Sequence, residues 1–288
     1  MNFDEQLGAR QTVALSAGEI SYRDVGDGKP IVFVHGLMTN SVLWHKVIPL
    51  LADGARCIAP DLPLGSHQSP MNPDADLTLP GLANLVNEFI AALDLTDVTL
   101  VGITVGGVIG TLAAFDDATR SDRISRLVLL PVDAYDNVPP KILKPMLRAG
   151  RVPGVIWAQA QSLRLESNRK MPFAYGRVAK KPFEPEMFEE FLTPLWTQRA
   201  SRHDLRKVLY DITPRHSRAV AEKYGQYHKP VLVVWSREDR LFPYAHAERI
   251  ASEFPNARLE TIPDSYTYVV QDQPRHVATV VQDFHKNA

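Results

Sequence analysis

The sequence has little cysteine, no excess of charge and no long apolar run. Cys57 is the single cysteine among 288 residues, so an internal disulfide and a thiolate metal cluster are both excluded. The 32 basic and 33 acidic residues nearly cancel, so charge gives no reason to expect nucleic acid or an anionic membrane as a partner. No stretch reaches the roughly 18 to 20 apolar residues of a membrane span, and residues 1–10 are polar, unlike a secretory signal. We therefore expect a cytoplasmic protein, either a monomer or a homodimer.

Short apolar runs alternate with helical patterns along most of the chain, which has an ordinary globular composition with 45% hydrophobic residues. This alternation predicts an α/β fold, with a mostly parallel eight-stranded sheet and helices on both faces. The first two strands are expected to form an antiparallel hairpin at the sheet edge. The expected strands are Thr12–Leu15, Ile20–Arg23, Ile31–Val34, Cys57–Ala59, Val98–Ile103, Ile124–Val132, Val231–Trp235 and Arg258–Ile262.

The strand pattern stops between residues 137 and 229. That segment holds helical patterns rich in proline, aromatic and basic residues, such as Glu186–Trp196. We interpret it as a helical cap inserted over the strand ends. The core would then consist of residues 1–136 and 230–288.

Five short motifs follow the expected strands in a fixed order, and together they resemble the α/β-hydrolase superfamily. Within it, the chain is most similar to the branch of haloalkane dehalogenases, epoxide hydrolases and esterases, which carry a helical cap between the sixth and seventh strands. The resemblance covers nearly the whole chain. The motifs are His35-Gly36, Pro60-Asp61-Leu62-Pro63-Leu64-Gly65-Ser66, Val101-Gly102-Ile103-Thr104-Val105-Gly106-Gly107, Trp235-Ser236-Arg237-Glu238-Asp239 and Ile262-Pro263-Asp264-Ser265-Tyr266-Thr267.

Two positions depart from this pattern, because both the nucleophile and the histidine base of the family are replaced by threonine. The glycines around Thr104 are typical of a nucleophile elbow, a tight strand-to-helix turn. An internal threonine is a weak nucleophile without a base to take its proton, and Thr267 at the histidine position supplies none. The covalent mechanism of the family is therefore disabled at both positions.

Other parts of the family's site are retained. Asp239 aligns with the acid that orients the family's histidine, and Asp133 occupies the alternative acid position after the sixth strand. Either carboxyl could act as a general acid or base near an apolar pocket. Alternatively, each accepts backbone hydrogen bonds at a strand end, which we favour for Asp133. The resemblance implies that the backbone N–H groups of Leu37 and Val105 form an oxyanion hole.

Several further side chains are candidates for the substrate pocket. His67, in the loop after the fourth strand, is either a displaced base or an ordinary loop histidine. We interpret the short basic cluster of Arg177, Lys180 and Lys181 as a solvated face. The remaining pocket candidates are His35, Met38, Trp44, Trp157, Tyr175, Tyr266 and Tyr268, with Phe173 and Trp196 as further aromatic residues of the cap.

No metal or cofactor motif is present in the sequence: it has no ligand cluster at metal spacing and no phosphate loop. The leading hypothesis is an enzyme that works on a small, mostly apolar molecule without a covalent intermediate, by cyclisation, isomerisation, elimination or a pericyclic step. The resemblance permits it, because some relatives without a full triad are biosynthetic cyclases. The alternatives are a hydrolase with a relocated base, a non-catalytic binding protein and, ranked lower, an inactivated hydrolase.

Overall fold

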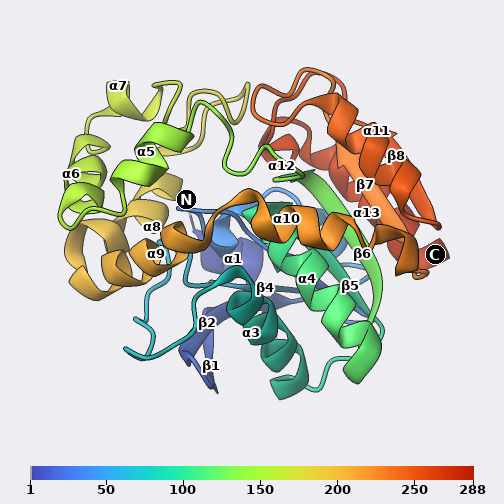
Figure 1. The fold of residues 1–288 in the computed structure, drawn as a ribbon. Helices are drawn as coiled ribbons and strands as arrows, with labels where there is room; N and C mark the ends of the chain where they lie inside the picture. The colour runs from blue at the N-terminus through green and yellow to red at the C-terminus, as the bar shows by residue number, and fades with distance from the viewer. Residues whose placement is uncertain (1) are drawn as a thin grey trace.

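An eight-stranded sheet forms the centre of the computed structural model, which describes residues 2–288 (Figure 1). The strand order is β1-β2-β4-β3-β5-β6-β7-β8. β2 runs antiparallel to β1 and β4, and every other neighbouring pair is parallel. The predicted fold class is thereby confirmed. The strands are β1 (Gln11–Leu15), β2 (Gly18–Val25), β3 (Pro30–Val34), β4 (Arg56–Pro60), β5 (Val98–Thr104), β6 (Ile124–Val132), β7 (Val231–Trp235) and β8 (Ala257–Thr261).

Helices cover both faces of this sheet, which explains why its central strands are apolar along their whole length. Successive side chains of a strand point to opposite faces. In β5, Leu100 points to one face of the sheet and packs beside Gly110 of α4. The preceding residue, Thr99, points to the other face, where its hydroxyl group forms a hydrogen bond of 2.8 Å with His285 of α13. The helices of the core are α1 (Phe3–Leu7), α2 (Ile48–Leu51), α3 (Leu79–Ala92), α4 (Val105–Arg120), α11 (Tyr244–Glu253), α12 (Val269–Asp272) and α13 (Pro274–Asn287), with a 3₁₀ turn at Ser41–Trp44.

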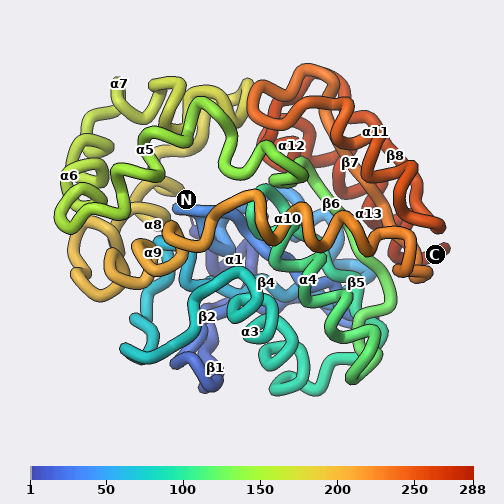
Figure 2. The backbone as a smooth tube through the Cα atoms, viewed as in Figure 1, coloured from blue at the N-terminus to red at the C-terminus, as the bar shows by residue number. Residues whose placement is uncertain are grey.

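The chain between β6 and β7 forms the cap. Within it the structure has no strand among its described residues. The segment from α5 to α9 folds together beside the sheet, and α10 returns along α4 (Figure 2). Among residues 2–288, every helix is too short or too polar to cross a bilayer. The cap helices are α5 (Lys144–Ala149), α6 (Val155–Ser162), α7 (Glu166–Arg169), α8 (Pro185–Thr197), α9 (Arg199–Asp211) and α10 (Pro214–Ala221), followed by a 3₁₀ turn at Tyr224–Gln226.

Candidate active site

A sharp turn joins β5 to α4 at Thr104. This residue has φ 51° and ψ -131°, a strained conformation for a β-branched side chain. Small neighbours make the turn possible: a methyl group on Gly106 would lie 2.2 Å from the backbone oxygen of His35. On Gly36, a methyl group would lie 2.0 Å from Oγ1 of Thr104. The backbone of a nucleophile elbow is therefore intact although its side chain is a threonine.

A cavity of about 520 Å³ lies between the strand ends and the cap. Its wall is mostly apolar, with a few polar groups contributed by Thr104, Asp133, Gln159, Ser162, Tyr175 and Tyr268. Apolar cavities with a few convergent polar groups are typical of small-molecule sites. The lining comprises Leu37, Met38, Thr104, Val105, Asp133, Pro139, Pro140, Ile142, Leu143, Pro145, Met146, Leu147, Gln159, Ser162, Leu163, Phe173, Ala174, Tyr175, Val178, Ile212, Leu241, Phe242 and Tyr268.

Asp133 follows the last residue of β6 and lines this cavity, with 7% of its surface exposed. Burial raises the pKa of its carboxyl group to about 8, because the charged form loses its hydration. Among residues 2–288, no hydrogen bond from another residue reaches this carboxyl group. Its own backbone N–H does donate to it, so the role that the sequence favoured, an acceptor of backbone hydrogen bonds at the strand end, stays a prediction beside that of a general acid. At neutral pH, the side chain is a protonated acid facing an apolar space.

The two tyrosines of the cavity wall are neutral and partly fixed by hydrogen bonds. Tyr175 donates its hydroxyl hydrogen to the backbone oxygen of Met38 at 2.8 Å. The backbone N–H of Tyr268 donates to the oxygen of Val178 at 2.6 Å, and its hydroxyl bonds with Thr39. Burial raises the pKa of both phenols, so neither is ionised near neutral pH. They can act as hydrogen-bond partners of a ligand but not as bases.

Asp239 and Thr267 form a hydrogen-bonded pair behind the cavity wall. The threonine hydroxyl donates to Oδ1 of Asp239 at 2.8 Å, and the backbone N–H groups of Leu241 and Phe242 donate to the same oxygen at 2.8 and 2.9 Å. The other carboxylate oxygen is buried without a partner among residues 2–288. Burial raises the pKa of Asp239 to about 6. Neither member of the pair lines the cavity, whereas Leu241 and Phe242 do.

The two backbone N–H groups expected to bind an oxyanion belong to Leu37 and Val105, and both residues line the cavity. Val105 is the first residue of α4, so its N–H has no acceptor within the helix. Among residues 2–288, the N–H of Leu37 has no acceptor either. Both donors are free, and their role stays a prediction.

Neither histidine predicted at the pocket lines the cavity. The ring of His35 is fixed in a neutral form, since Nδ1 donates to the backbone oxygen of Gly36 at 2.8 Å and Nε2 accepts the N–H of Leu62 at 2.9 Å. Burial lowers its pKa. His67 is buried as well, with Nε2 at 3.2 Å from the carboxylate of Asp204 on α9. His35 therefore holds the loops of the core together, and His67 joins the core to the cap.

The tryptophans that we placed at the pocket also lie elsewhere. Trp44 is fully buried in the core, with its ring centroid 5.0 Å from that of Phe33. Trp196 donates its indole N–H to the oxygen of Ala160 between α8 and α6. Trp157 is 50% exposed on the outer surface of the cap. A pattern of apolar residues in the sequence does not reveal whether a large side chain points into the cavity, into the core or to the outer surface.

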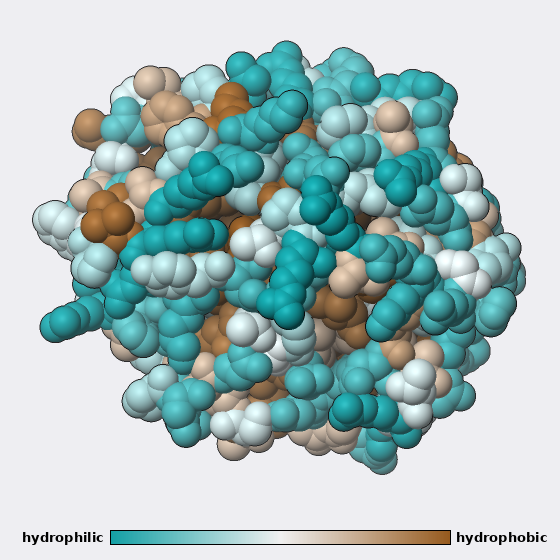
Figure 3. Space-filling view, in the orientation of Figure 1, coloured by the Kyte–Doolittle hydropathy of each residue, from teal (hydrophilic) through white to brown (hydrophobic). Residues whose placement is uncertain are grey.

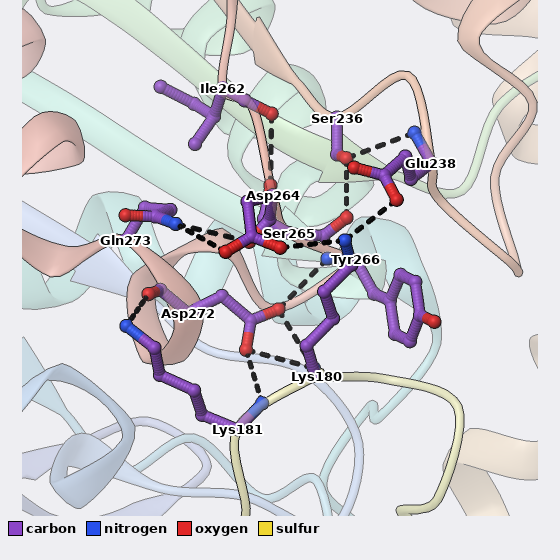
Figure 4. A network of polar contacts seen from close by, with 10 residues as sticks. All are labelled: Lys180, Lys181, Ser236, Glu238, Ile262, Asp264, Ser265, Tyr266, Asp272 and Gln273. Carbon is purple, nitrogen blue, oxygen red and sulfur yellow. Dashed lines mark hydrogen bonds and ion pairs between the residues drawn. The ribbon is translucent and has the colours of Figure 1, made fainter.

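Tyr266 belongs to a polar network that ties the end of the basic cluster to the core (Figure 4). The buried carboxylate of Asp272 accepts the backbone N–H groups of Tyr266, Lys180 and Lys181 at 2.8 to 2.9 Å. The ring of Tyr266 lies below the guanidinium group of Arg240, 4.1 Å from it. The ammonium group of Lys180 pairs with two further carboxylates. Tyr266 is therefore not a pocket residue, and Lys180 is an anchored side chain rather than part of a solvated face.

The largest group of cavity residues that the sequence did not reveal lies in residues 139–147, at the start of the cap. These residues form one wall through two consecutive prolines and the apolar side chains of α5 and the turn before it. A proline-rich apolar stretch at the start of an inserted segment was the available signal. Among residues 2–288, no group of three or more histidine, cysteine or acidic side chains is placed to hold a metal ion.

Comparisons with known proteins agree with this fold. The family model described as the alpha/beta hydrolase fold matches residues 29–273. Haloalkane dehalogenase 2 of Mycobacterium tuberculosis is 27% identical over 276 residues, covering 92% of this chain and 91% of that protein. The cis-3-alkyl-4-alkyloxetan-2-one decarboxylase of Shewanella oneidensis is 25% identical over 293 residues, with coverage of 96% and 87%.

Among solved structures, an ancestral haloalkane dehalogenase superposes with a TM-score of 0.76 at 23% identity, covering 96% of this chain and 98% of that one. At this identity the likeness concerns the fold. The family match spans most of the chain and includes strands β3 to β8, the elbow and the cap. The chain belongs to the α/β-hydrolase fold family.

Proposed function

We propose that this chain is an enzyme that acts on a small, mostly apolar molecule without forming a covalent bond to it. The observation that carries the proposal is the buried carboxyl group of Asp133, which faces an apolar cavity where burial raises its pKa to about 8. A general acid works best when its pKa lies near the working pH. Perturbed carboxyl groups in cavities are frequent markers of active sites.

The absence of a base at the elbow supports a non-covalent reaction. No histidine belongs to the described residues that line the cavity. The relocated base that we considered, His67, is already bonded to Asp204. Thr104 also has no hydrogen-bond partner among residues 2–288 that would take its proton. A hydrolase with a relocated base is therefore the weaker proposal.

The remaining groups fit an oxygen-containing substrate with apolar substituents. The apolar wall would hold the substituents, and the free N–H groups of Leu37 and Val105 would polarise the oxygen atom. Asp133 would donate a proton or a hydrogen bond to the same functional group as its charge develops. Positioning combined with preorganised donors is sufficient for ring opening, elimination or isomerisation.

A substrate class is suggested by the relative from Shewanella oneidensis. Its name describes loss of CO2 from a four-membered lactone with two alkyl chains. Such a lactone yields CO2 and an alkene, and the balance needs no water. Its two apolar chains and single ester group match an apolar cavity with one polar region. We therefore propose dialkyl oxetanones as the first substrates to test.

The experiment measures alkene release from a cis-dialkyl oxetan-2-one by gas chromatography. The variants are Asp133→Asn, Thr104→Ala and, as a matched control, Asp239→Asn, whose carboxyl group lies outside the cavity. We expect Asp133→Asn to lower kcat by about 100-fold or more, the usual effect of losing a general acid. Thr104→Ala and the control should stay within a few-fold of the wild type, and the wild-type rate should fall above about pH 8.

Parallel assays test the alternatives. Epoxides, haloalkanes and p-nitrophenyl esters are offered to the same variants, together with a fluorophosphonate label. Turnover or labelling that Thr104→Ala abolishes would overturn the non-covalent mechanism in favour of a working threonine nucleophile. Saturable binding of these compounds without turnover would identify a binding protein instead.

A further inference from the structure

The first part of the cap is strongly basic. Residues 141–181 contain ten lysine or arginine residues and a single acidic residue, Glu166. In the rest of the chain, acidic residues outnumber basic ones by 32 to 22. The net charge of -1 therefore conceals a local asymmetry, and our expectation of no membrane partner depended on that whole-chain value.

Most of these positive charges are not neutralised. Lys170 pairs with Glu166, and Lys180 pairs with two carboxylates of the core. Lys141 and Arg148 are exposed, and Lys144 at the start of α5 is partly exposed. The ammonium group of Lys181 bonds a backbone oxygen, that of Asp272, rather than a carboxylate. The basic side chains of the segment without a carboxylate partner among residues 2–288 are Lys141, Lys144, Arg148, Arg151, Arg164, Arg169, Arg177 and Lys181.

Exposed apolar side chains are concentrated in the same segment. It holds five of the seven large hydrophobic residues that are exposed among residues 2–288, with exposed fractions of 43 to 62%. In Figure 3, brown apolar side chains lie among teal ones over the region of α5, α6 and α7. The five residues are Val152, Trp157, Leu165, Met171 and Phe173.

The cavity opens toward this surface. Pro145, Ser162 and Phe173 all line the cavity and are also exposed to solvent. They belong to the first turn of α5, the end of α6 and the loop after α7. An apolar molecule that arrives at this basic surface would therefore enter the cavity directly, without passing over other parts of the protein surface.

We propose that residues 141–181 dock on an anionic lipid bilayer, with the cavity opening facing the membrane. Basic side chains are attracted to the negative surface of such a bilayer, and interspersed apolar side chains enter its interfacial region. A nucleic acid or an acidic protein would match the charge, but neither accounts for the exposed Leu165, Met171 and Trp157. This docking does not depend on the reaction proposed above.

The test is co-sedimentation of the purified chain with vesicles. We expect binding to vesicles of 70% phosphatidylcholine and 30% phosphatidylglycerol, weak binding to pure phosphatidylcholine, and a steep decrease between 50 and 500 mM NaCl. Lys144→Gln with Arg148→Gln should weaken partitioning about thirtyfold, since each basic residue near an anionic surface contributes about fivefold. The matched control removes two exposed basic residues of α13, Arg275→Gln with Lys286→Gln, and should bind as the wild type does.

Insertion of the apolar side chains is measured separately. Trp157 is the most exposed of the four tryptophans, and the other three are buried. Its fluorescence should shift to the blue on vesicle binding, and Trp157→Phe should remove that shift. Leu165→Ser with Met171→Ser should weaken partitioning while leaving the salt dependence in place.

Three outcomes would overturn the proposal. The first is an absence of binding to the anionic vesicles at 50 mM NaCl. The second is an equal loss of binding in the α13 control. The third is binding to a short DNA duplex that matches vesicle binding in strength and is unaffected by Leu165→Ser with Met171→Ser, which would identify a polyanion site. Each result is obtained without any substrate, so it is independent of the proposed reaction.

Discussion

The carboxyl group of Asp133 makes the stability of the fold depend on pH in a way that an amide would not. Burial raises its pKa from 3.8 to about 8. In the unfolded chain, this group loses its proton near pH 4, whereas in the folded protein it keeps the proton up to about pH 8. The contribution of the protonated Asp133 carboxyl group to the free energy of unfolding is therefore complete below pH 4 and is lost as the pH rises to 8. Within this window, the free energy of unfolding falls by about 1.4 kcal/mol per pH unit because of this one group.

Asp133→Asn preserves the shape of the side chain and removes the ionisation. We expect the free energy of unfolding of the variant, relative to the wild type, to increase by about 3 kcal/mol between pH 5 and pH 7. Any constant effect of the amide cancels in this difference. The measurement is urea unfolding of both proteins at pH 5, 6 and 7 and at fixed ionic strength.

Asp239→Asn serves as the control for this experiment, because the pKa of Asp239 is raised only to about 6. Its difference from the wild type should grow up to pH 6 and then level off. If the difference between Asp133→Asn and the wild type is the same at all three pH values, the raised pKa of Asp133 is refuted. The basis for its role as an acid at neutral pH is then lost as well.

Three further predictions concern the elbow. Gly106→Ala places a methyl group 2.2 Å from a backbone oxygen and should destabilise the fold by about 3 kcal/mol or more in urea unfolding. The control Gly225→Ala, whose methyl group would have no atom within 4 Å, should change stability by less than about 1 kcal/mol. Equal effects of the two substitutions would contradict the packing argument. Thr104→Gly should stabilise the protein by about 1 kcal/mol because it relieves the strained backbone, and a loss of stability would show that the side chain contributes more than the strain costs. Thr104→Ser combined with Thr267→His should gain p-nitrophenyl esterase activity and fluorophosphonate labelling that neither single change gives. A histidine at position 267 would contact Asp239 as Thr267 does, and the resemblance to the family places it within reach of a serine at position 104. An inert double variant would show that the cap or the backbone blocks such a triad.

The sheet and the elbow could be predicted from sequence because both depend on strong local signals. Buried strands such as Val231–Trp235 consist entirely of apolar residues, and the structure has a strand at these same positions. The glycines around Thr104 mark a turn at which no side chain fits, so their pattern is tied to backbone geometry. Such signals depend on the backbone and not on which side chain stands at position 104.

The surroundings of single side chains could not be predicted in the same way. His67 and Asp204 lie 137 residues apart in sequence, and their contact exists only because α9 folds back on the core. Trp157 and Trp44 are equally apolar, yet one lies on the outer surface and the other in the core. Composition alone does not distinguish these cases, because the direction of a side chain is set by the packing of distant elements. The burial of Asp133 is of the same kind, since the cavity that it lines is formed in part by side chains of the cap.

The threonines at positions 104 and 267 are better explained by a site that is still in use than by one that has lost its function. At position 267, an apolar residue would leave the buried Asp239 carboxylate with one hydrogen bond fewer, at a cost of about 1 to 3 kcal/mol. The threonine hydroxyl supplies that bond at 2.8 Å. At position 104, the strained backbone is kept although the residue there is among the least suited to positive φ. A fold released from function would be expected to lose this strain by a change to glycine, so its retention argues that the cavity in front of the elbow is still in use.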